Sequence, residues 1–348
     1  MQLPEVTDPW TVRDADFPAG APPEDRLRFL LQYAILAPSA HNTQPWFFRL
    51  HGDSVDLYAD RTRALPVVDP TDRELTISCG AALGHLQTAA RRFGYTDEVT
   101  LLPDPSTPDL LARVRLGTPR AADPEELALF AAVANRRTNR HRFEDRLLPA
   151  ALGEELTAHA RAGGVHLAIV DDAGVKTSIV GLVMRGDRTQ MADPRFRREL
   201  ASWMHPQRSA THDGLSAYEL GRASLGLDPM MTRVSSLVVR TFDMGNSQAA
   251  VDRQLVEHSP VLAIFWTDGD TPRDWLQTGQ ALSRVLLKAT AAGVSASFLN
   301  QPVEVEELRV ELARLVSATW PQLLLRLGYG PHIEPSARRP LTEVVRAG

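Results

Sequence analysis

The stretch LAPSAHNTQPWFF, residues 36–48, concentrates hydroxyl, amide and imidazole groups in a short segment that prolines enclose. Each proline fixes its own backbone dihedral and cannot continue a helix, so the segment is predicted to be a stiff loop. Its side chains and free backbone N–H groups suit the polar edge of a heterocycle rather than a metal ion, and a small residue among them lets a flat ligand approach. The residues with these properties are Ser39, Ala40, Asn42 and Gln44.

Two other interpretations of this loop are open. A structural turn without a ligand would also use proline, serine and asparagine. A serine hydrolase would use Ser39 and His41 as nucleophile and base. These two residues are very close on one extended loop, however, the sequence contains no G-x-S-x-G elbow, and no third catalytic residue is evident. We therefore favour ligand binding over hydrolysis.

A second chemically distinctive stretch is NRRTNRHRF at 135–143. An arginine side chain can donate two parallel hydrogen bonds to a phosphate group. Lysine occurs only at positions 176 and 288, however, so arginine supplies nearly all of the 38 basic residues and a solvated basic turn is the alternative. The candidate binding residues of this stretch are Arg136, Arg137, Thr138 and Arg140.

Apolar periodicity predicts the elements that position both stretches. A helix over 24–37 precedes the loop, and a β-hairpin with Gly52 and Asp53 in its turn follows it. A second helix ends at Gly94, and a short helix and the strand LARVRLG complete the first half. In the second half the predicted strands are VHLAIVDD, PVLAIFWTDG and QLLLRLGYG, and a long helix ends at Gly293.

The two halves contain an internal sequence similarity. GAALGHLQTAARRFGY, which begins at Gly80, is similar to GQALSRVLLKATAAGV, which begins at Gly279. Both are followed by a polar loop, a helix and a strand that ends in RLG. Chance likeness between alanine-rich helices is the alternative, but the order of the elements favours two related halves.

Composition excludes several classes of protein. The net charge of −5 gives no polycationic surface for nucleic acid or anionic lipid. The longest apolar run, VLAIFW, is far shorter than the roughly 20 residues of a membrane-spanning helix, and residues 1–20 lack an apolar signal core. Cys79 is the single cysteine, and the histidines of MHPQRSATH lack the spacing of zinc ligands. We expect a cytoplasmic protein without a bound metal, a nucleic-acid partner or a membrane partner.

The two stretches together resemble a known family. APSAHNTQPW is similar to the flavin-contacting loop of the nitroreductase superfamily, and NRRTNRHRF resembles its arginine-rich signature. SARRPLTEVV at 336–345 resembles the C-terminal basic signature of the same superfamily. The loop precedes both basic signatures here, which is the reverse of the usual order. This arrangement is similar to Acg-type flavoproteins, in which one chain imitates a nitroreductase dimer.

The resemblance implies an α+β, nitroreductase-like fold with two tandem halves around a pseudo-twofold axis. We expect the first half to span 1–120 and the second 121–348, with a lid-like insertion at about 185–250. The first half lacks an arginine signature before its loop, and the second lacks the small-residue loop. One complete flavin site per chain is therefore expected, so a monomer would be functionally sufficient, and a homodimer is also compatible.

The resemblance also implies a role for each matching residue in binding FMN. Pro38, Ser39, Ala40, Asn42 and Gln44 would line the ring and the ribityl chain. The phosphate and ribityl contacts would come from Arg136, Arg137, Thr138, Arg338 and Arg339. Arg140 would lie near the N1/O2 edge of the flavin. Phe298 and Leu299 of SFLNQ would pack on the ring, and the Asn300 backbone N–H would donate to flavin N5, although family members usually carry other residues there.

The resemblance implies an FMN-dependent oxidoreductase that passes hydride through flavin N5 from a reduced donor, NAD(P)H, to a nitroaromatic, a quinone or a similar acceptor. Because the cofactor carries the chemistry, no side chain is assigned as catalytic. The sequence has no dinucleotide-binding fingerprint, so NAD(P)H would bind transiently over the flavin. The alternative is a non-catalytic protein that stores or sequesters FMN beneath the insertion.

Overall fold

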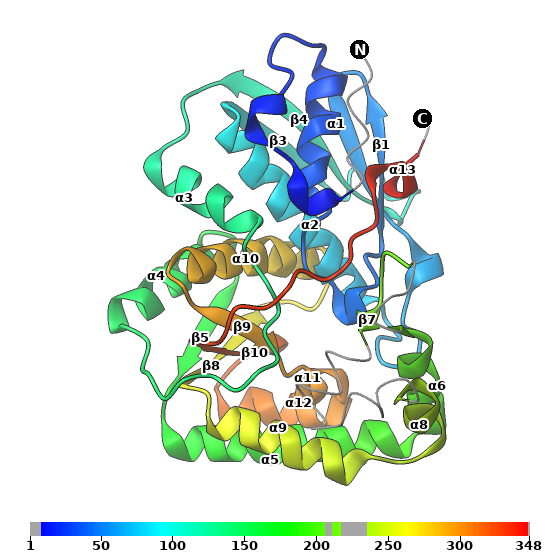
Figure 1. The fold of residues 1–348 in the computed structure, drawn as a ribbon, viewed down its shortest axis with the longest axis vertical. Coiled ribbons are helices and arrows are strands. Elements are labelled where there is room, and N and C mark those ends of the chain that lie inside the picture. The colour runs from blue at the N-terminus through cyan, green and yellow to red at the C-terminus, as the bar shows by residue number, and fades with distance from the viewer. Residues whose placement is uncertain (1–7, 206–210, 217–234, 347–348) are drawn as a thin grey trace.

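The computed structural model describes residues 8–205, 211–216 and 235–346. The first β-sheet lies toward one end of the molecule and the second lies near its middle, with helices α2 (Arg73–Arg92) and α10 (Pro272–Ala291) between the two sheets (Figure 1). Helices α5 (Ala173–Ala192) and α9 (Gly245–Glu257) lie beyond the second sheet at the other end. In spatial order the first sheet contains β11 (Val345–Arg346), β1 (Trp46–His51), β2 (Ser54–Ala59), β4 (Leu110–Pro119) and β3 (Tyr95–Leu101). The second sheet contains β5 (His166–Val170), β8 (Val261–Thr267), β10 (Trp320–Gly328) and β9 (Ser295–Phe298).

Helices cover the two sheets. Those of the N-terminal region are α1 (Pro23–Ala34), α2 (Arg73–Arg92), α3 (Pro124–Val133) and α4 (Ala150–Arg161). The remaining helices are α5 (Ala173–Ala192), α6 (Pro194–Ser202), α8 (Ser235–Thr241), α9 (Gly245–Glu257), α10 (Pro272–Ala291), α11 (Gln301–Glu304), α12 (Glu306–Leu315) and α13 (Leu341–Val344). Short 3₁₀ turns lie at Pro9–Thr11, Asp14–Asp16, Ala40–Asn42 and Arg61–Arg63, and β6 (Met204–His205) pairs with β7 (Leu215–Ser216).

The first sheet confirms the predicted hairpin. β1 and β2 are antiparallel, with Trp46 opposite Ala59, and Gly52 has a φ of +61° in the turn between them. The predicted short helix between α2 and β4 is wrong, because YTDEVTL forms β3 instead. Polar Thr96, Glu98 and Thr100 share one face of the strand, whereas Val99 and Leu101 lie on the other, and this pattern fits an edge strand that pairs with β4.

The second sheet is buried on both faces. Along β8, Val261, Ala263 and Phe265 face the same core as α10, whereas Leu262 and Ile264 pack in a second core with residues of α5 and α12. This double burial explains the uninterrupted apolar run of the strand, which would be costly if one face met water.

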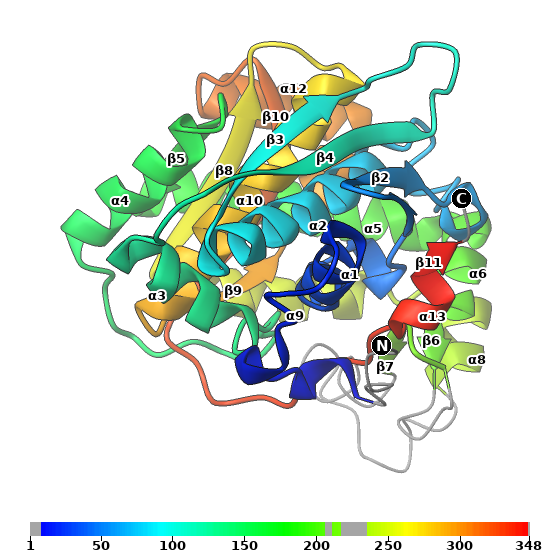
Figure 2. The same ribbon diagram turned by 90° about the horizontal axis from the view of Figure 1, so that it is seen from above.

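The central contact is between α2 and α10, the two helices that contain the similar sequences of the two halves. The backbones meet at Gly80 and Gly279, where a Cβ on Gly279 would overlap the Ile77 carbonyl oxygen. Figure 2 shows both helices in the middle of the molecule, with the strands around them. The internal sequence similarity therefore identified two helices that contact each other. Common descent of the halves and the pseudo-twofold axis remain predictions.

The C-terminal segment crosses the molecule. After β10 it runs past α10 to α13 and ends in β11, which pairs in parallel with β1 (Figure 1). Strands from both ends of the chain therefore share the first sheet. The predicted insertion at 185–250 contains the end of α5, then α6 and α8, and the start of α9; its parts at 206–210 and 217–234 lie outside the described residues. Its role as a lid remains a prediction.

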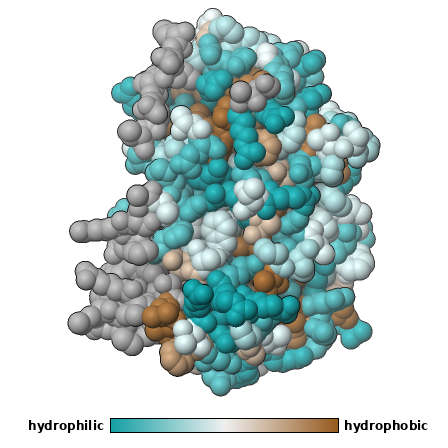
Figure 3. Space-filling view, turned by 90° about the vertical axis from the view of Figure 1, so that its right-hand side faces the viewer, coloured by the Kyte–Doolittle hydropathy of each residue, from teal (hydrophilic) through white to brown (hydrophobic). Residues whose placement is uncertain are grey.

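The face that carries α6, α8 and α13 is mostly hydrophilic (Figure 3). Hydrophobic side chains form small, separate patches among the described residues of this face. No helix within the described ranges is long and apolar enough to cross a membrane.

Replacing Gly279 with alanine should destabilise the protein. The added methyl would overlap backbone atoms of α2, and overpacking of this kind costs about 1–3 kcal/mol. Urea unfolding would measure the difference. The control is Gly181→Ala on the exposed side of α5, where a Cβ meets nothing within 4 Å and should stabilise the helix by about 1 kcal/mol. Equal effects of the two substitutions would contradict a tight crossing of α2 and α10.

Candidate functional site

The proline-enclosed loop has a strained, well-anchored backbone. His41, Asn42 and Gln44 have φ values of +47°, +54° and +50°, in the left-handed region that side chains other than glycine rarely adopt. The Ser39 hydroxyl accepts a hydrogen bond from the Gln44 backbone N–H at 2.9 Å, and the Ala40 N–H donates to Ser78 Oγ of α2 at 3.2 Å. The loop is therefore stiff, as the prolines predict.

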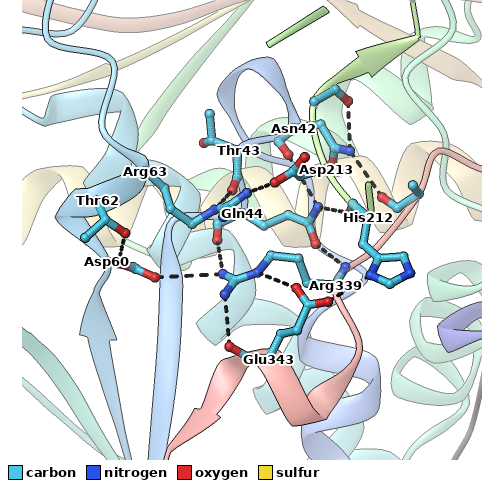
Figure 4. A network of polar contacts seen from close by, with 12 residues as sticks. Asn42, Thr43, Gln44, Asp60, Thr62, Arg63, His212, Asp213, Arg339 and Glu343 are labelled. Atoms are coloured by element: carbon cyan, nitrogen blue, oxygen red, sulfur yellow. Dashed lines mark hydrogen bonds and ion pairs between the residues drawn. The ribbon is translucent and has the colours of Figure 1, made fainter. Parts of the chain in front are cut away.

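The C-terminal segment holds the loop in this conformation (Figure 4). The Gln44 side-chain oxygen accepts from the Arg339 backbone N–H at 2.8 Å, and Gln44 Nε2 donates to the His212 carbonyl at 2.8 Å. Arg339 donates in turn to the Gln44 carbonyl at 3.1 Å and to the Glu343 carbonyl at 2.9 Å. Asn42 Nδ2 donates to the carbonyls of Gly214 and Ala337, each at 3.1 Å.

These contacts divide the predicted site residues into groups. Asn42, Gln44 and Arg339 bind one another and neighbouring backbone, and none of the three lines the cavity described below. Leu299 packs in the core that β8 shares with α5 and also does not line the cavity. The structure thus gives these four residues positions behind the cavity wall, and direct contact with a cofactor remains a prediction for them.

A cavity of about 250 Å³ lies beside the loop. Seven predicted site residues line it, although they come from three distant parts of the chain. They are Pro38, Ser39, Ala40, Thr138, Arg140, Phe298 and Asn300. Thr138 reaches the cavity because its segment lies along β9 through a bridge to Ala296, and the Asn139 N–H donates to the Ala296 carbonyl at 2.8 Å. The folded chain therefore brings the loop, the arginine stretch and the SFLNQ segment together.

The remaining three predicted residues form a group that we call the buried arginine cluster. Arg136 and Arg338 are buried, and Arg137 is half-buried beside them. Arg136 and Arg338 both donate to the Leu36 carbonyl, at 3.4 and 3.3 Å, at the start of the loop. Arg137 and Arg338 both lie over the Trp10 ring, at 4.1 and 5.1 Å from its centroid. Arg338 also donates to Asn42 Oδ1 at 2.9 Å.

The charge of this cluster is poorly compensated. Among the described residues, no ion pair joins its three guanidinium groups to a carboxylate, and the Nε atom of each is buried without a hydrogen-bond partner. Burial and the neighbouring Arg137 lower the pKa of Arg136 to about 9, and burial with both neighbours lowers the pKa of Arg338 well below its ordinary value. Buried cations without a carboxylate partner are costly, so this arrangement fits an anionic ligand.

Several cavity residues were missed by sequence reasoning. His41 lines the cavity, and burial together with the nearby Arg140 lowers its pKa to about 4, so its imidazole is neutral at pH 7. Three carboxyl groups also line the cavity. They are Glu74, Asp187 and Glu304. Their only sequence signal is position on a buried helix face, which cannot be recognised before the helix partners are known.

Lowering the pH from 7 to 5 should destabilise the protein partly through His85, which is fully buried behind the arginine cluster. Burial and Arg136 lower the pKa of His85 to about 3, whereas the unfolded chain takes up a proton near pH 6.5. Stability is therefore greatest above pH 6.5 and falls below it, by about 2 kcal/mol at pH 5 for this group. In urea unfolding, the free energy of unfolding should depend less on pH in His85→Gln than in the wild type. In the exposed control His332→Gln its pH dependence should match that of the wild type. An unchanged pH dependence in His85→Gln would contradict the depressed pKa.

Comparison with known proteins gave relatives over nearly the whole chain. No family model matches. The Mycobacterium tuberculosis protein named "Putative NAD(P)H nitroreductase Rv3131" is 31% identical over 330 residues, which cover 93% of this chain and 92% of that protein. The M. tuberculosis protein named "Putative NAD(P)H nitroreductase acg" is 28% identical over 330 residues, which cover 92% of this chain and 95% of that protein.

Solved structures also match part of the chain. The FMN-dependent nitroreductase NfnB of Mycobacterium smegmatis, solved in complex with NADPH, has a TM-score of 0.40 and 13% identity. The match covers 63% of this chain and 97% of NfnB.

Proposed function

The chain belongs to the NAD(P)H nitroreductase family, and from this premise we propose that it is an FMN-dependent oxidoreductase. The observation that carries the proposal is the buried arginine cluster beside the stiff loop. A dianionic phosphate would compensate its charge and accept hydrogen bonds from its unpartnered Nε atoms. The residues present therefore fit the phosphate end of FMN.

The cavity residues fit the rest of the cofactor. Pro38 and Ala40 present a flat, small surface on which a ring can lie, and Phe298 offers an apolar wall. Thr138 contributes a hydroxyl, and Arg140 brings positive charge that favours an electron-rich ring. When bound, FMN supplies two-electron transfer between a reduced nicotinamide and an acceptor.

A single chain supplies every part of this proposed site. The loop belongs to the predicted first half, and the arginine stretch, the SFLNQ segment and the C-terminal arginines belong to the second. We infer that one chain binds one FMN without a second subunit. The donor is NAD(P)H, and the acceptor is a quinone, a nitroaromatic or a similar small molecule.

The double variant Arg136→Met/Arg338→Met should bind FMN at least about 100-fold more weakly, because two charge-assisted contacts of about 1.5–3 kcal/mol each are lost. Riboflavin lacks the phosphate, so its affinity should change little. Fluorescence titration of the flavin-free protein would measure both affinities. The control Arg113→Met removes an arginine whose partner is Asp56 on the first sheet and should keep wild-type FMN affinity. Equal weakening of FMN and riboflavin would contradict phosphate binding by the cluster.

Anaerobic mixing of the FMN-loaded protein with NADH and NADPH should bleach the flavin absorbance with at least one of them. Subsequent addition of a quinone should restore the oxidised spectrum, because a ping-pong oxidoreductase binds its donor and acceptor in turn. Stopped-flow absorbance would follow both steps. If neither nucleotide bleaches a flavin that dithionite does reduce, the oxidoreductase proposal is wrong and the storage alternative is favoured.

A further inference from the structure

Two buried carboxyl groups meet at the wall of the cavity, on the side formed by the packed helices α5 and α9. Asp187 of α5 is 3% exposed and Asp252 of α9 is 5% exposed. Gln301 Nε2 donates to both, at 3.0 Å to Asp187 Oδ1 and 2.9 Å to Asp252 Oδ2. Gln248 Nε2 adds a second hydrogen bond to Asp252 Oδ2 at 3.1 Å.

The contact between the two carboxyl groups requires a proton. Asp187 Oδ2 is buried and receives no hydrogen bond from an N–H or hydroxyl donor of the described residues. The neighbouring carboxyl group is that of Asp252, which shares the Gln301 Nε2 donor with Asp187. Two ionised carboxylates offer no donor and repel each other, so they share a hydrogen bond only if one stays protonated. Burial and the Asp252 carboxyl together raise the pKa of Asp187 to about 8.

The surrounding charges place this proton on Asp187. Burial raises the pKa of Asp252, but the hydrogen bond from Gln248 and the charge of Arg326 on β10 oppose this rise and so favour its ionised form. Glu304 of α11 raises the pKa of Asp187 and so favours its protonated form. Glu311 of α12 is an exposed carboxylate, and Arg185 of α5 compensates its charge in an ion pair at 2.6 Å. Asp187 therefore acts as the acid of the pair and Asp252 as its anionic partner.

Only the acid of this pair reaches the ligand. Asp187 lines the same cavity as Phe298 and Asn300, whereas Asp252 lies behind it and is not part of the lining. The other cavity carboxyl groups lie near a cation: Glu74 Oε1 is 3.6 Å from Arg73 Nη2, and the charge of Arg73 also lowers the pKa of Glu304. Asp187 forms no ion pair among the described residues, and its donor Gln301 is neutral, so no cation in contact with it favours its ionised form.

We propose that Asp187 is a catalytic general acid, which protonates a quinone-type acceptor during its two-electron reduction in the cavity. This inference rests on the proposed oxidoreductase function. It adds a proton donor to a site in which sequence reasoning assigned no catalytic side chain.

The proposed step balances in electrons and protons. Reduction of a quinone to a hydroquinone takes two electrons and two protons. The hydride that originates from NAD(P)H brings both electrons and one proton, and forms one O–H bond. At the second quinone oxygen, the Asp187 O–H bond breaks and a new O–H bond forms, which leaves the electron pair on the Asp187 carboxylate. Asp187 regains its proton from solvent after the hydroquinone leaves, so NAD(P)H is oxidised and the quinone is reduced.

The test compares a quinone, whose reduction consumes protons, with ferricyanide, whose reduction does not. The flavin of the FMN-loaded protein is reduced anaerobically with dithionite, so the result does not depend on the nucleotide donor. Stopped-flow absorbance then gives the rate of reoxidation by benzoquinone and by ferricyanide. General acid catalysis raises a reaction rate about 10²–10⁴-fold. Asp187→Asn should therefore lower the rate ratio, defined as the benzoquinone rate divided by the ferricyanide rate, at least about 100-fold.

The pH profile separates an acid from a structural residue. The wild-type rate ratio should fall as pH rises through about 8, where Asp187 loses its proton, and the ratio of Asp187→Asn should not change with pH. In Asp252→Asn the anionic partner is gone, so the midpoint should move to lower pH. The control Asp56→Asn, a buried carboxyl of the first sheet, should keep the wild-type ratio. An unchanged ratio in flavin-loaded Asp187→Asn would overturn the inference.

Infrared spectroscopy supplies a readout that does not depend on activity. The wild-type protein should show C=O absorption of protonated carboxyl groups at pH 7, to which Glu74 also contributes because burial raises its pKa. Asp187→Asn should lose one component of this absorption. A difference spectrum between wild type and Asp187→Asn without a lost component would also overturn the inference. Failure of the proposed function is recognised separately, because a protein that binds no flavin shows no flavin absorbance after incubation with FMN.

Discussion

The close contact between the α2 and α10 backbones determines where the candidate site can form. Gly80 and Gly279 let the two helices approach until only backbone atoms separate them. Ser78 of α2 anchors the loop at Ala40, and the SFLNQ segment follows α10 through β9. Because these two walls of the cavity are each attached to one of the helices, the distance between the helices fixes the separation of the loop from the SFLNQ segment. A bulkier crossing would move the loop away from Phe298.

The second constraint is electrostatic, and it comes from the C-terminal segment that crosses the molecule. Arg339 uses its hydrogen bonds to hold the loop, whereas the adjacent Arg338 enters the buried arginine cluster. Burial of the Arg136 and Arg338 guanidinium groups without carboxylate partners opposes folding, since a desolvated charge is costly. A phosphate would remove much of this cost, which would couple cofactor binding to the docking of the segment.

Sequence reasoning located most elements, and half of the predicted site residues line the cavity, because apolar periodicity and the composition of the loop are local signals. It was wrong between α2 and β4, where it expected a short helix and the chain forms the edge strand β3. It missed Asp187 and Asp252 for a different reason. These residues lie on separate helices and become a pair only when α5 packs against α9, so no local pattern distinguishes them from solvated surface acids.

The arginine cluster and the Asp187–Asp252 pair use desolvation in opposite ways. Arginine keeps its charge even when burial lowers its pKa, so the cluster remains cationic and can attract an anion at neutral pH. A buried carboxyl group instead keeps its proton, and burial converts Asp187 from an anion into a neutral donor. Both groups break the rule that buried charges are paired, and such exceptions are expected at functional sites. The cluster lies at the start of the loop and Asp187 lines the cavity that the loop borders, as expected of a site that holds an anion at one end and delivers a proton at the other.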